Sequence, residues 1–103
     1  MTVEEDMSAA IAGRVVVRIT RAKDPAGTSR IGEPHILYES ARGRVLVDLY
    51  QTGGYSSSER PPMWRLVALA DVRSVVLLEE RFEPRPTYNP QNRTRYRRII
   101  CAV

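Results

Sequence analysis

The densest run of apolar residues lies between residues 63 and 78 and predicts two short strands joined by a tight turn. The run reads Met-Trp-Arg-Leu-Val-Ala-Leu, then Ala-Asp-Val-Arg, then Ser-Val-Val-Leu-Leu, and it contains the only tryptophan. Short apolar runs bounded by polar turn residues are typical of buried strands. We therefore expect the core to form around this stretch, with the second strand continuing to residue 80.

Alternation of apolar and polar residues predicts three more strands, over residues 14–21, 31–38 and 44–51. The last is the clearest, because every second residue from 45 to 49 is Val or Leu and the residues between them face the other way. Pro34 interrupts the middle strand. It predicts a bulge or an edge position there, because proline has no N–H for the strand ladder.

A short helix is expected over residues 2–12. Thr2 and Glu5 stand at the spacing of a capping box, and Gly13 is suited to end the helix. A helix this short is marginal alone, so we expect it to dock on the sheet. The residues that would form its apolar face are Val3, Met7, Ala10 and Ile11.

Turn-forming residues connect these elements at residues 24–27 and 40–43. Residues 52–62 are rich in Gly, Ser and Pro, and they predict a mobile loop that is long enough to bind a ligand. Five strands, one helix and short connections favour a small β-barrel or sandwich over a layered βαβ fold, because no second helix falls between strands.

The chain changes character near its C-terminal end. Residues 83–90 contain three prolines and are expected to be extended. Residues 99–103 are apolar again, and they would add a strand to the sheet or pair with another subunit. We therefore divide the chain into a β-barrel domain with its helix, residues 1–83, and a basic C-terminal extension, residues 84–103, that packs as a strand.

Size and composition indicate an ordinary soluble domain. The chain has 103 residues, of which 43% are hydrophobic and 27% charged. No apolar run approaches the roughly 18 residues that span a membrane, and the acidic N-terminus is unlike a signal peptide. The single cysteine, Cys101, permits no internal disulfide and favours a reducing, cytoplasmic location.

All of the excess positive charge lies in the C-terminal extension. Residues 84–103 carry five arginines and no acid, whereas residues 1–83 carry 11 basic and 12 acidic residues. Arginines interleaved with tyrosines are typical of a nucleic-acid contact strip, and basic tails also occur on ordinary soluble proteins. The arginines assigned to the strip are Arg93, Arg95, Arg97 and Arg98.

The sequence offers no recognisable catalytic set. His35 is the only histidine, so it has no companion for a metal site or for a second catalytic base. The serines at residues 56–58 lack a nucleophile-elbow sequence and are typical of a flexible linker. Cys101 stands in an apolar run with no base near it in the sequence. We therefore predict a non-catalytic protein without a cofactor or a metal.

Three segments taken together resemble the WYL domain family. They are Arg-Ile-Gly-Glu-Pro-His-Ile-Leu-Tyr at residues 30–38, residues 43–51, and Trp-Arg-Leu-Val-Ala-Leu-Ala-Asp-Val at residues 64–72. The triplet Trp-Tyr-Leu of the family corresponds to Val-Leu-Val at residues 45–47, and the second arginine of its last motif falls on Ala68. The chain thus resembles a divergent, short, stand-alone branch of that family.

This resemblance implies an SH3-like, Sm-like small β-barrel of about five strands preceded by a helix. Family members commonly lie in bacterial transcription regulators beside a helix-turn-helix and are similar to sensors of nucleotides or nucleic acid. This chain has no room for a helix-turn-helix. The resemblance therefore implies a unit that acts through a partner regulator or binds its ligand alone.

Arg30 and Arg65 match family arginines on neighbouring strands, which implies an anion clamp for a phosphate or a nucleic-acid backbone. The simpler alternative is that both are surface arginines paired with Glu33 or Asp48. His35 corresponds to a position near the family's ligand face, where we expect a structural or hydrogen-bonding role. The predicted ligand-binding residues are Arg30, His35, Tyr50, Gln51, Tyr55 and Arg65.

Aromatic residues near this face could stack on bases, as small barrels do with single strands. Tyr55, in the predicted loop, is the stronger stacking candidate, and Trp64 is expected to pack in the core. We predict a non-catalytic regulatory module that binds a nucleotide or single-stranded nucleic acid. The alternative is a structural interaction module that dimerises through its C-terminal strand.

Overall fold

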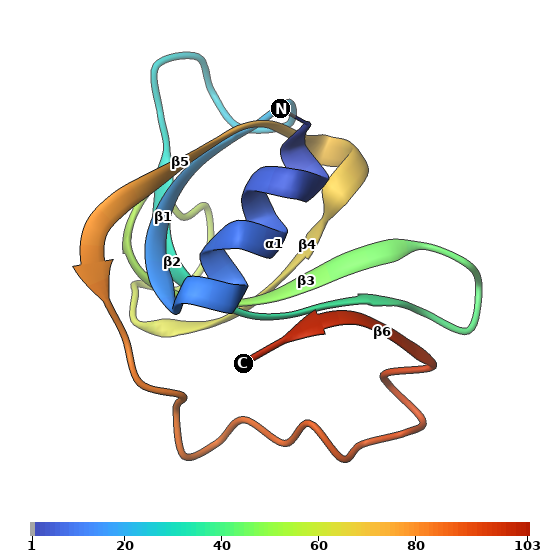
Figure 1. Cartoon of the computed structure of the whole chain (residues 1–103). Helices are drawn as coiled ribbons and strands as arrows, with labels where there is room; N and C mark the ends of the chain where they lie inside the picture. Colours follow the sequence, from blue (N-terminus) through green and yellow to red (C-terminus); the bar gives the residue numbers. More distant parts are fainter. Residues whose placement is uncertain (1) are drawn as a thin grey trace.

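Two long strands, β2 (Arg30–Glu39) and β3 (Val45–Gly54), form a hairpin at the centre of the sheet (Figure 1). The structure is a computed structural model and describes residues 2–103. In chain order, the other elements are α1 (Val3–Gly13), β1 (Val15–Arg21), β4 (Met63–Ala68), the 3-10 helix η1 (Leu69–Asp71), β5 (Val72–Arg81) and β6 (Arg98–Ala102).

All strand pairs are antiparallel, and the sheet runs in the order β4-β3-β2-β1-β5. One edge of β2 is shared, because β1 pairs with residues 30–32 and β6 pairs with residues 36–39. The strands β4 and β5 stand at opposite ends of this order and no pairing joins them in the described chain. The fold is therefore mainly β, with one short helix on an open six-stranded sheet.

The apolar stretch of residues 63–78 spans β4, η1 and the first part of β5. The connection between its two strands is tight, as predicted, but the strands do not pair with each other. Instead, η1 carries the chain from one end of the sheet to the other. Val67, Val72 and Val75 enter the core, whereas Leu66 and Val76 remain exposed.

The capping box of α1 is confirmed. Glu5 N–H donates to Thr2 Oγ1 at 3.1 Å, and Thr2 N–H donates to Glu5 Oε1 at 2.9 Å. The helix ends within one residue of the predicted position. Gly13 is the last helical residue, and Arg14 takes the left-handed conformation with φ of 53°. No helix in residues 2–103 is long and apolar enough to cross a membrane.

The predicted bulge at Pro34 is confirmed. The register of β2 against β3 shifts between Pro34 and Ile36, which leaves His35 without a partner on β3. The position of Pro34 is also edge-like on one side, because it lies between the residues of β2 that pair with β1 and those that pair with β6. The bulge also changes which residues of β2 face the core after residue 35.

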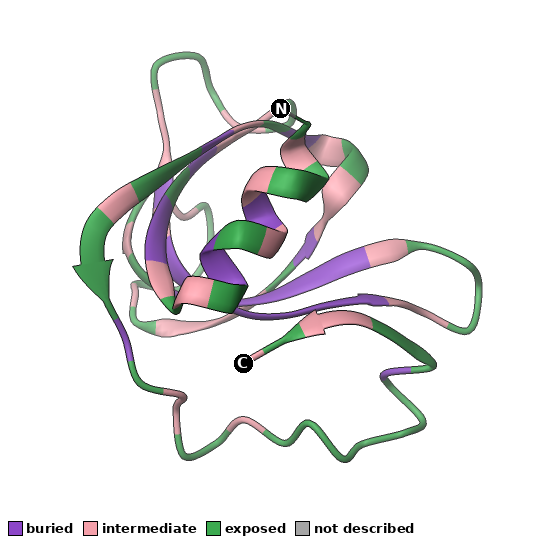
Figure 2. Cartoon of the chain, in the orientation of Figure 1, coloured by how far each residue is buried: buried purple, intermediate pink, exposed green. Residues whose placement is uncertain are grey.

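The sheet has two covered faces, which we call inner and outer. The inner face packs against α1 and contains the main core (Figure 2). The outer face of β2, β3 and β4 is covered by residues 82–97, which cross it without regular structure before β6 begins. The buried inner-face residues of the strands include Val17, Ile19, Leu37, Val47, Leu49 and Val67, and the outer cluster consists of Ile36, Tyr38, Leu46 and Tyr96.

The apolar C-terminus adds a strand to the sheet of its own chain. Residues 98–102 pair with β2, and Val103 N–H donates to His35 O at 2.9 Å. Ile100, Cys101 and Val103 pack against the main core. The last residues therefore pair with the edge of β2 that β1 leaves unpaired after residue 32.

The close approach of the backbone at Gly54, the last residue of β3, can be tested by substitution. Gly54 has φ of 85°, and a Cβ added there would overlap Ser29 O and lie 2.8 Å from Arg30 Cα. Gly27 has φ of 82° but its Cβ would meet nothing within 4 Å. We expect Gly27→Ala to lower the free energy of unfolding by about 1 kcal/mol and Gly54→Ala by about 3 kcal/mol or more. Equal losses in urea denaturation would contradict the close backbone approach at Gly54.

Candidate functional site

Arg30 is buried at the start of β2, with only 3% of its surface exposed. Its Nε and Nη2 donate to the two carboxylate oxygens of Asp24 at 2.8 and 3.0 Å. Its Nη1 donates to Gln51 Oε1 at 3.1 Å. Each nitrogen of this guanidinium therefore has a partner inside the protein, and Arg30 acts as a structural bridge between the β1–β2 turn and β3.

Gln51 continues this network toward the following loop. Its side chain is fully buried, and its Nε2 donates to Gly53 O at 3.1 Å and to Tyr55 O at 2.8 Å. The Arg30 guanidinium lies 5.4 Å from the centre of the Tyr55 ring. Three predicted ligand-binding residues, Arg30, Gln51 and Tyr55, are thus brought together and hold the loop entrance in place.

Arg65 reaches the same end of the inner face from β4. The expectation that Arg30 and Arg65 lie on neighbouring strands is wrong, because β3 separates β4 from β2. It stands opposite Leu49 in the register, so both side chains share that face. Its Nη2 donates to Ser56 Oγ at 2.9 Å. Its Nε is buried and makes no hydrogen bond to any described residue, and the same holds for Arg21 Nε on β1.

Arg21, Arg30 and Arg65 together form a cluster with one carboxylate, Asp24, which we call the arginine cluster. The hydrogen bonds from Arg30 hold the pKa of Asp24 below its usual value, with smaller contributions from the charges of Arg30, Arg21 and Arg65. Arg30 contacts Asp24 directly, whereas Arg21 and Arg65 act on it through their charge. Three arginines and one carboxylate give the cluster a net positive charge. Unpaired N–H groups in such surroundings favour an anion.

Two members of this cluster, Arg21 and Asp24, were not among the residues predicted from the sequence. A signal for Arg21 was present, because Val17, Ile19 and Arg21 alternate and the arginine therefore extends the inner-face series. Asp24 carried only a turn signal. Its pairing with Arg30 follows from the fold, because the turn brings the start of β2 next to the end of β1.

The remaining predicted ligand residues, His35 and Tyr50, lie on the outer face. Tyr50 lies between Leu49 and Gln51 in β3, and both of these residues face inward. Because side chains alternate along a strand, the Tyr50 side chain points to the outer face. The Arg85 guanidinium lies 4.5 Å from the Tyr50 ring centre. We expected His35, Tyr50 and Gln51 to share the face of Arg30 and Arg65. This is wrong for His35 and Tyr50.

His35 is fully enclosed by β4 and by residues 82–88. Its ring lies 4.8 Å from Trp64, 5.0 Å from Phe82 and 5.1 Å from Tyr88, measured between ring centres. Nδ1–H donates to Glu33 O at 2.8 Å, and Nε2 accepts from Arg85 N–H at 3.1 Å. These two backbone partners select the neutral Nδ1–H tautomer.

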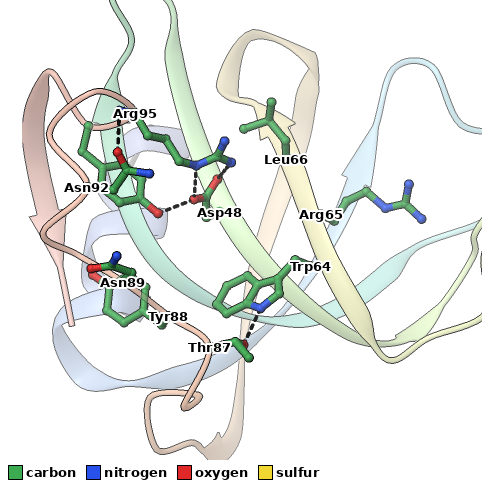
Figure 3. A pocket seen from close by; sticks show the side chains of 10 residues that line it. Asp48, Trp64, Arg65, Leu66, Thr87, Tyr88, Asn89, Asn92 and Arg95 are labelled. Atoms are coloured by element: carbon green, nitrogen blue, oxygen red, sulfur yellow. Dashed lines mark hydrogen bonds and ion pairs between the residues drawn. The ribbon is translucent and has the colours of Figure 1, made fainter.

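Asp48 attaches the extension to the outer face through side-chain hydrogen bonds (Figure 3). Arg95 donates to its two oxygens at 2.9 and 2.7 Å. Tyr96 and Tyr38 donate their hydroxyls to it at 2.7 and 3.1 Å. The two carboxylate oxygens thus accept four hydrogen bonds, and Asp48 itself is 6% exposed.

The arginines of the extension fall into two groups. Arg93 and Arg97 are exposed. Arg95 pairs with Asp48, and Arg98 lies 3.5 Å from Glu39. Glu33, which sequence reasoning offered with Asp48 as a partner for Arg30 or Arg65, pairs with Arg85 instead, through two contacts of 2.8 Å. Part of the predicted basic strip is therefore neutralised by carboxylates of the sheet.

Trp64 lies on the outer face and not in the main core. It is partly exposed, and its Nε1 donates to Thr87 Oγ1 at 2.8 Å. Within residues 2–103, no group of three His, Cys, Asp or Glu side chains is placed to hold a metal ion. Partial burial raises the pKa of the Cys101 thiol, which disfavours the reactive thiolate.

Comparison with known proteins gives no assignment, because no family model, no curated protein and no solved structure matches the chain. The candidate site is therefore defined by its geometry. It consists of the arginine cluster at the end of the inner face, bordered by Gln51, Tyr55 and Ser56.

His35 predicts a specific pH dependence. Burial, as the largest effect, and the Arg85 charge lower its pKa from the usual 6.5, against the opposing influence of the Glu33 carbonyl and the Glu33 and Asp48 charges. The unfolded chain then binds the proton more tightly than the folded chain. We expect the free energy of unfolding to fall as the pH drops from about 6.5 through the folded-state pKa.

NMR titration measures this directly, because His35 supplies the only imidazole signals. The expected result is a midpoint below 6.5 and a neutral Nδ1–H ring at pH 7. In urea denaturation, His35→Gln should flatten the pH dependence over this window. A midpoint at or above 6.5 would contradict the buried neutral ring.

Proposed function

We propose that this protein is a non-catalytic, ligand-binding regulatory module that captures an anionic ligand, a nucleotide or single-stranded nucleic acid, at the arginine cluster. The observation that carries this proposal is the pair of buried Nε–H groups on Arg21 and Arg65 that no described residue accepts. A buried donor without an acceptor is costly. A phosphate oxygen would satisfy it and would offset the excess positive charge.

Within the cluster, the two arginines of the original clamp have different roles. Arg30 has committed its Nε, Nη1 and Nη2 to Asp24 and Gln51, so it organises the site and is unsuited to bind directly. Arg65 has one internal contact, to Ser56 in the loop. The proposed binding group is therefore Arg65 together with Arg21, while Arg30 fixes their surroundings.

The architecture supports the finer assignment to a WYL-like, SH3-like or Sm-like barrel. A helix precedes five sequential strands that pair in the order β5-β1-β2-β3-β4, which agrees with the helix-then-barrel arrangement implied by the resemblance. On this proposal, binding at the cluster would alter the loop of residues 55–62, because Ser56 and Tyr55 contact Arg65 and Gln51. A partner regulator could then bind the loop in its altered conformation.

Fluorescence polarisation with short labelled single-stranded DNA and RNA tests the proposal. We expect binding that weakens between about 50 mM and about 200 mM salt. Arg65→Ala should reduce the association constant by at least about 10-fold, since it removes charge-assisted hydrogen bonds to phosphate. The variant should stay folded, because it loses a single internal hydrogen bond.

Arg42→Ala is the matched control, because it removes the same charge at the turn that joins β2 to β3, at the opposite end of that hairpin from Arg30 and Gly54. It should leave the association constant unchanged within about 2-fold. Arg30→Ala is unsuitable as a binding variant, because it would leave Asp24 buried without its partner. No binding at low salt, or equal losses in Arg42→Ala and Arg65→Ala, would refute anion capture at this cluster.

A second function, a protein-interaction module, is supported by one observation. β6 pairs with β2 along one edge, and Ile99 on β6 is 47% exposed. An exposed apolar residue on an edge strand favours pairing with another chain. A dimer in size-exclusion chromatography that Ile99→Lys dissociates, together with no oligonucleotide binding, would favour this alternative.

A further inference from the structure

A cavity of about 470 Å³ lies on the outer face, between β4 and the C-terminal extension (Figure 3). Trp64 and Leu66 of β4 stand on one side of it, and Asn89 and Asn92 of the extension stand on the other. Its size is within the range of small-molecule sites. The lining residues are Asp48, Trp64, Arg65, Leu66, Thr87, Tyr88, Asn89, Asn92, Arg95 and Tyr96.

The apolar wall is rigid and aromatic. The Trp64 indole is fixed through Nε1 to Thr87, and the rings of His35 and Tyr50 contact it edge-on at 4.8 and 5.3 Å between centres. Leu66 extends this wall and is 49% exposed. A planar ring could lie against such a surface at little cost in ordering the protein.

The cavity is close to neutral. Asp48 and Arg95 form a bidentate pair, and the hydroxyls of Tyr38 and Tyr96 occupy the remaining acceptor positions of the carboxylate. The Arg65 side chain belongs to the lining but extends away from the cavity toward the inner face (Figure 3). These features disfavour a phosphate here and favour an uncharged ligand.

The free polar groups of the lining are mostly donors. Asn89 Oδ1 accepts from Gln91 N–H, and Asn92 Oδ1 accepts from Arg95 N–H, both at 3.2 Å. These backbone donors fix both amides, and neither NH₂ group donates to another residue of the described chain. The Tyr88 hydroxyl is buried and has no partner among the described residues. A ligand must therefore bring acceptors.

We propose that this cavity binds a neutral planar heterocycle with two carbonyl acceptors, of the uracil and thymine type. The ring would lie against Trp64 and Leu66. Its carbonyl oxygens would accept from the NH₂ groups of Asn89 and Asn92. Adenine is a poorer match, because its amino group would meet the donor-rich side.

This inference goes beyond the proposed anion site and uses other side chains. Trp64 and Arg65 are adjacent in β4, so they project to opposite faces of that strand. A uracil-type base can come from a free nucleoside or from a single strand. The two sources share the same ring chemistry, and the experiment separates them.

Fluorescence of Trp64, the only tryptophan, reports on the cavity in the full chain. We expect saturable quenching by uridine up to about 20 mM and at least about 10-fold weaker quenching by adenosine. Asn92→Asp retains the oxygen that accepts from Arg95 N–H but loses the NH₂ donor and adds a negative charge. It should weaken uridine binding by about 10-fold or more.

Gln91→Glu is the matched control, because it makes the same chemical change on an exposed neighbour outside the lining. It should leave the uridine affinity within about 2-fold. Asn89→Asp provides a second test if Asn92→Asp alters the thermal midpoint. Linear, non-saturating quenching, or equal effects of Asn92→Asp and Gln91→Glu, would overturn the proposal.

Arg21→Ala separates this site from the arginine cluster, because Arg21 belongs to that cluster and is not among the residues that line the cavity. It should leave uridine quenching unchanged while oligonucleotide polarisation falls, and a loss of uridine quenching in this variant would overturn the assignment of the base to the cavity. Oligo-dT that displaces uridine at equal base concentration identifies a strand as the source. Saturable uridine binding without such displacement identifies the free nucleoside. Either source supports a uracil-type site.

Discussion

The buried carboxylate of Asp48 is the constraint on which the outer half of this structure depends. It stands in the middle of β3 and accepts four hydrogen bonds from Tyr38, Arg95 and Tyr96. Burial, the hydrogen bond to Asp48 and the Asp48 charge raise the pKa of Tyr96 to about 12. A buried carboxylate that loses such hydrogen bonds is costly to the fold. The carboxylate therefore fastens an irregular segment that has few backbone hydrogen bonds of its own.

The fastened segment gives the sheet two separate surfaces with different chemistry. On the inner face, Arg30 and Asp24 hold a positively charged site in place. Gln51 and Ser56 link this site to the following loop through their hydrogen bonds. On the outer face, the segment supplies the amides and hydroxyls that complete a nearly neutral cavity against Trp64. Adjacent residues of a single strand serve the two faces, so charge and aromatic surface are separated by strand alternation alone.

Local signals in the sequence predicted the elements with local causes. The capping box of Thr2 and Glu5 and the bulge at Pro34 follow from the preferences of a few neighbouring residues. The attachment of Asp48 could not be predicted, because Arg95 is 47 residues away and the pairing depends on the path of the whole extension. The sequence could have predicted that the ligand residues divide between two faces, because the adjacent residues Tyr50 and Gln51 must point to opposite faces of a strand.

The most direct test of this account is hydrogen–deuterium exchange of the Asp48→Asn variant, followed by mass spectrometry of peptides from the full chain. If Asp48 fastens the extension, amides of residues 84–103 and of the adjoining part of β2 should exchange faster, while those of α1 and β1 keep their protection. Unchanged exchange in residues 84–103 would contradict the central role of Asp48. A uniform loss of protection over the chain would also contradict it, because the extension would then not be an independently held layer.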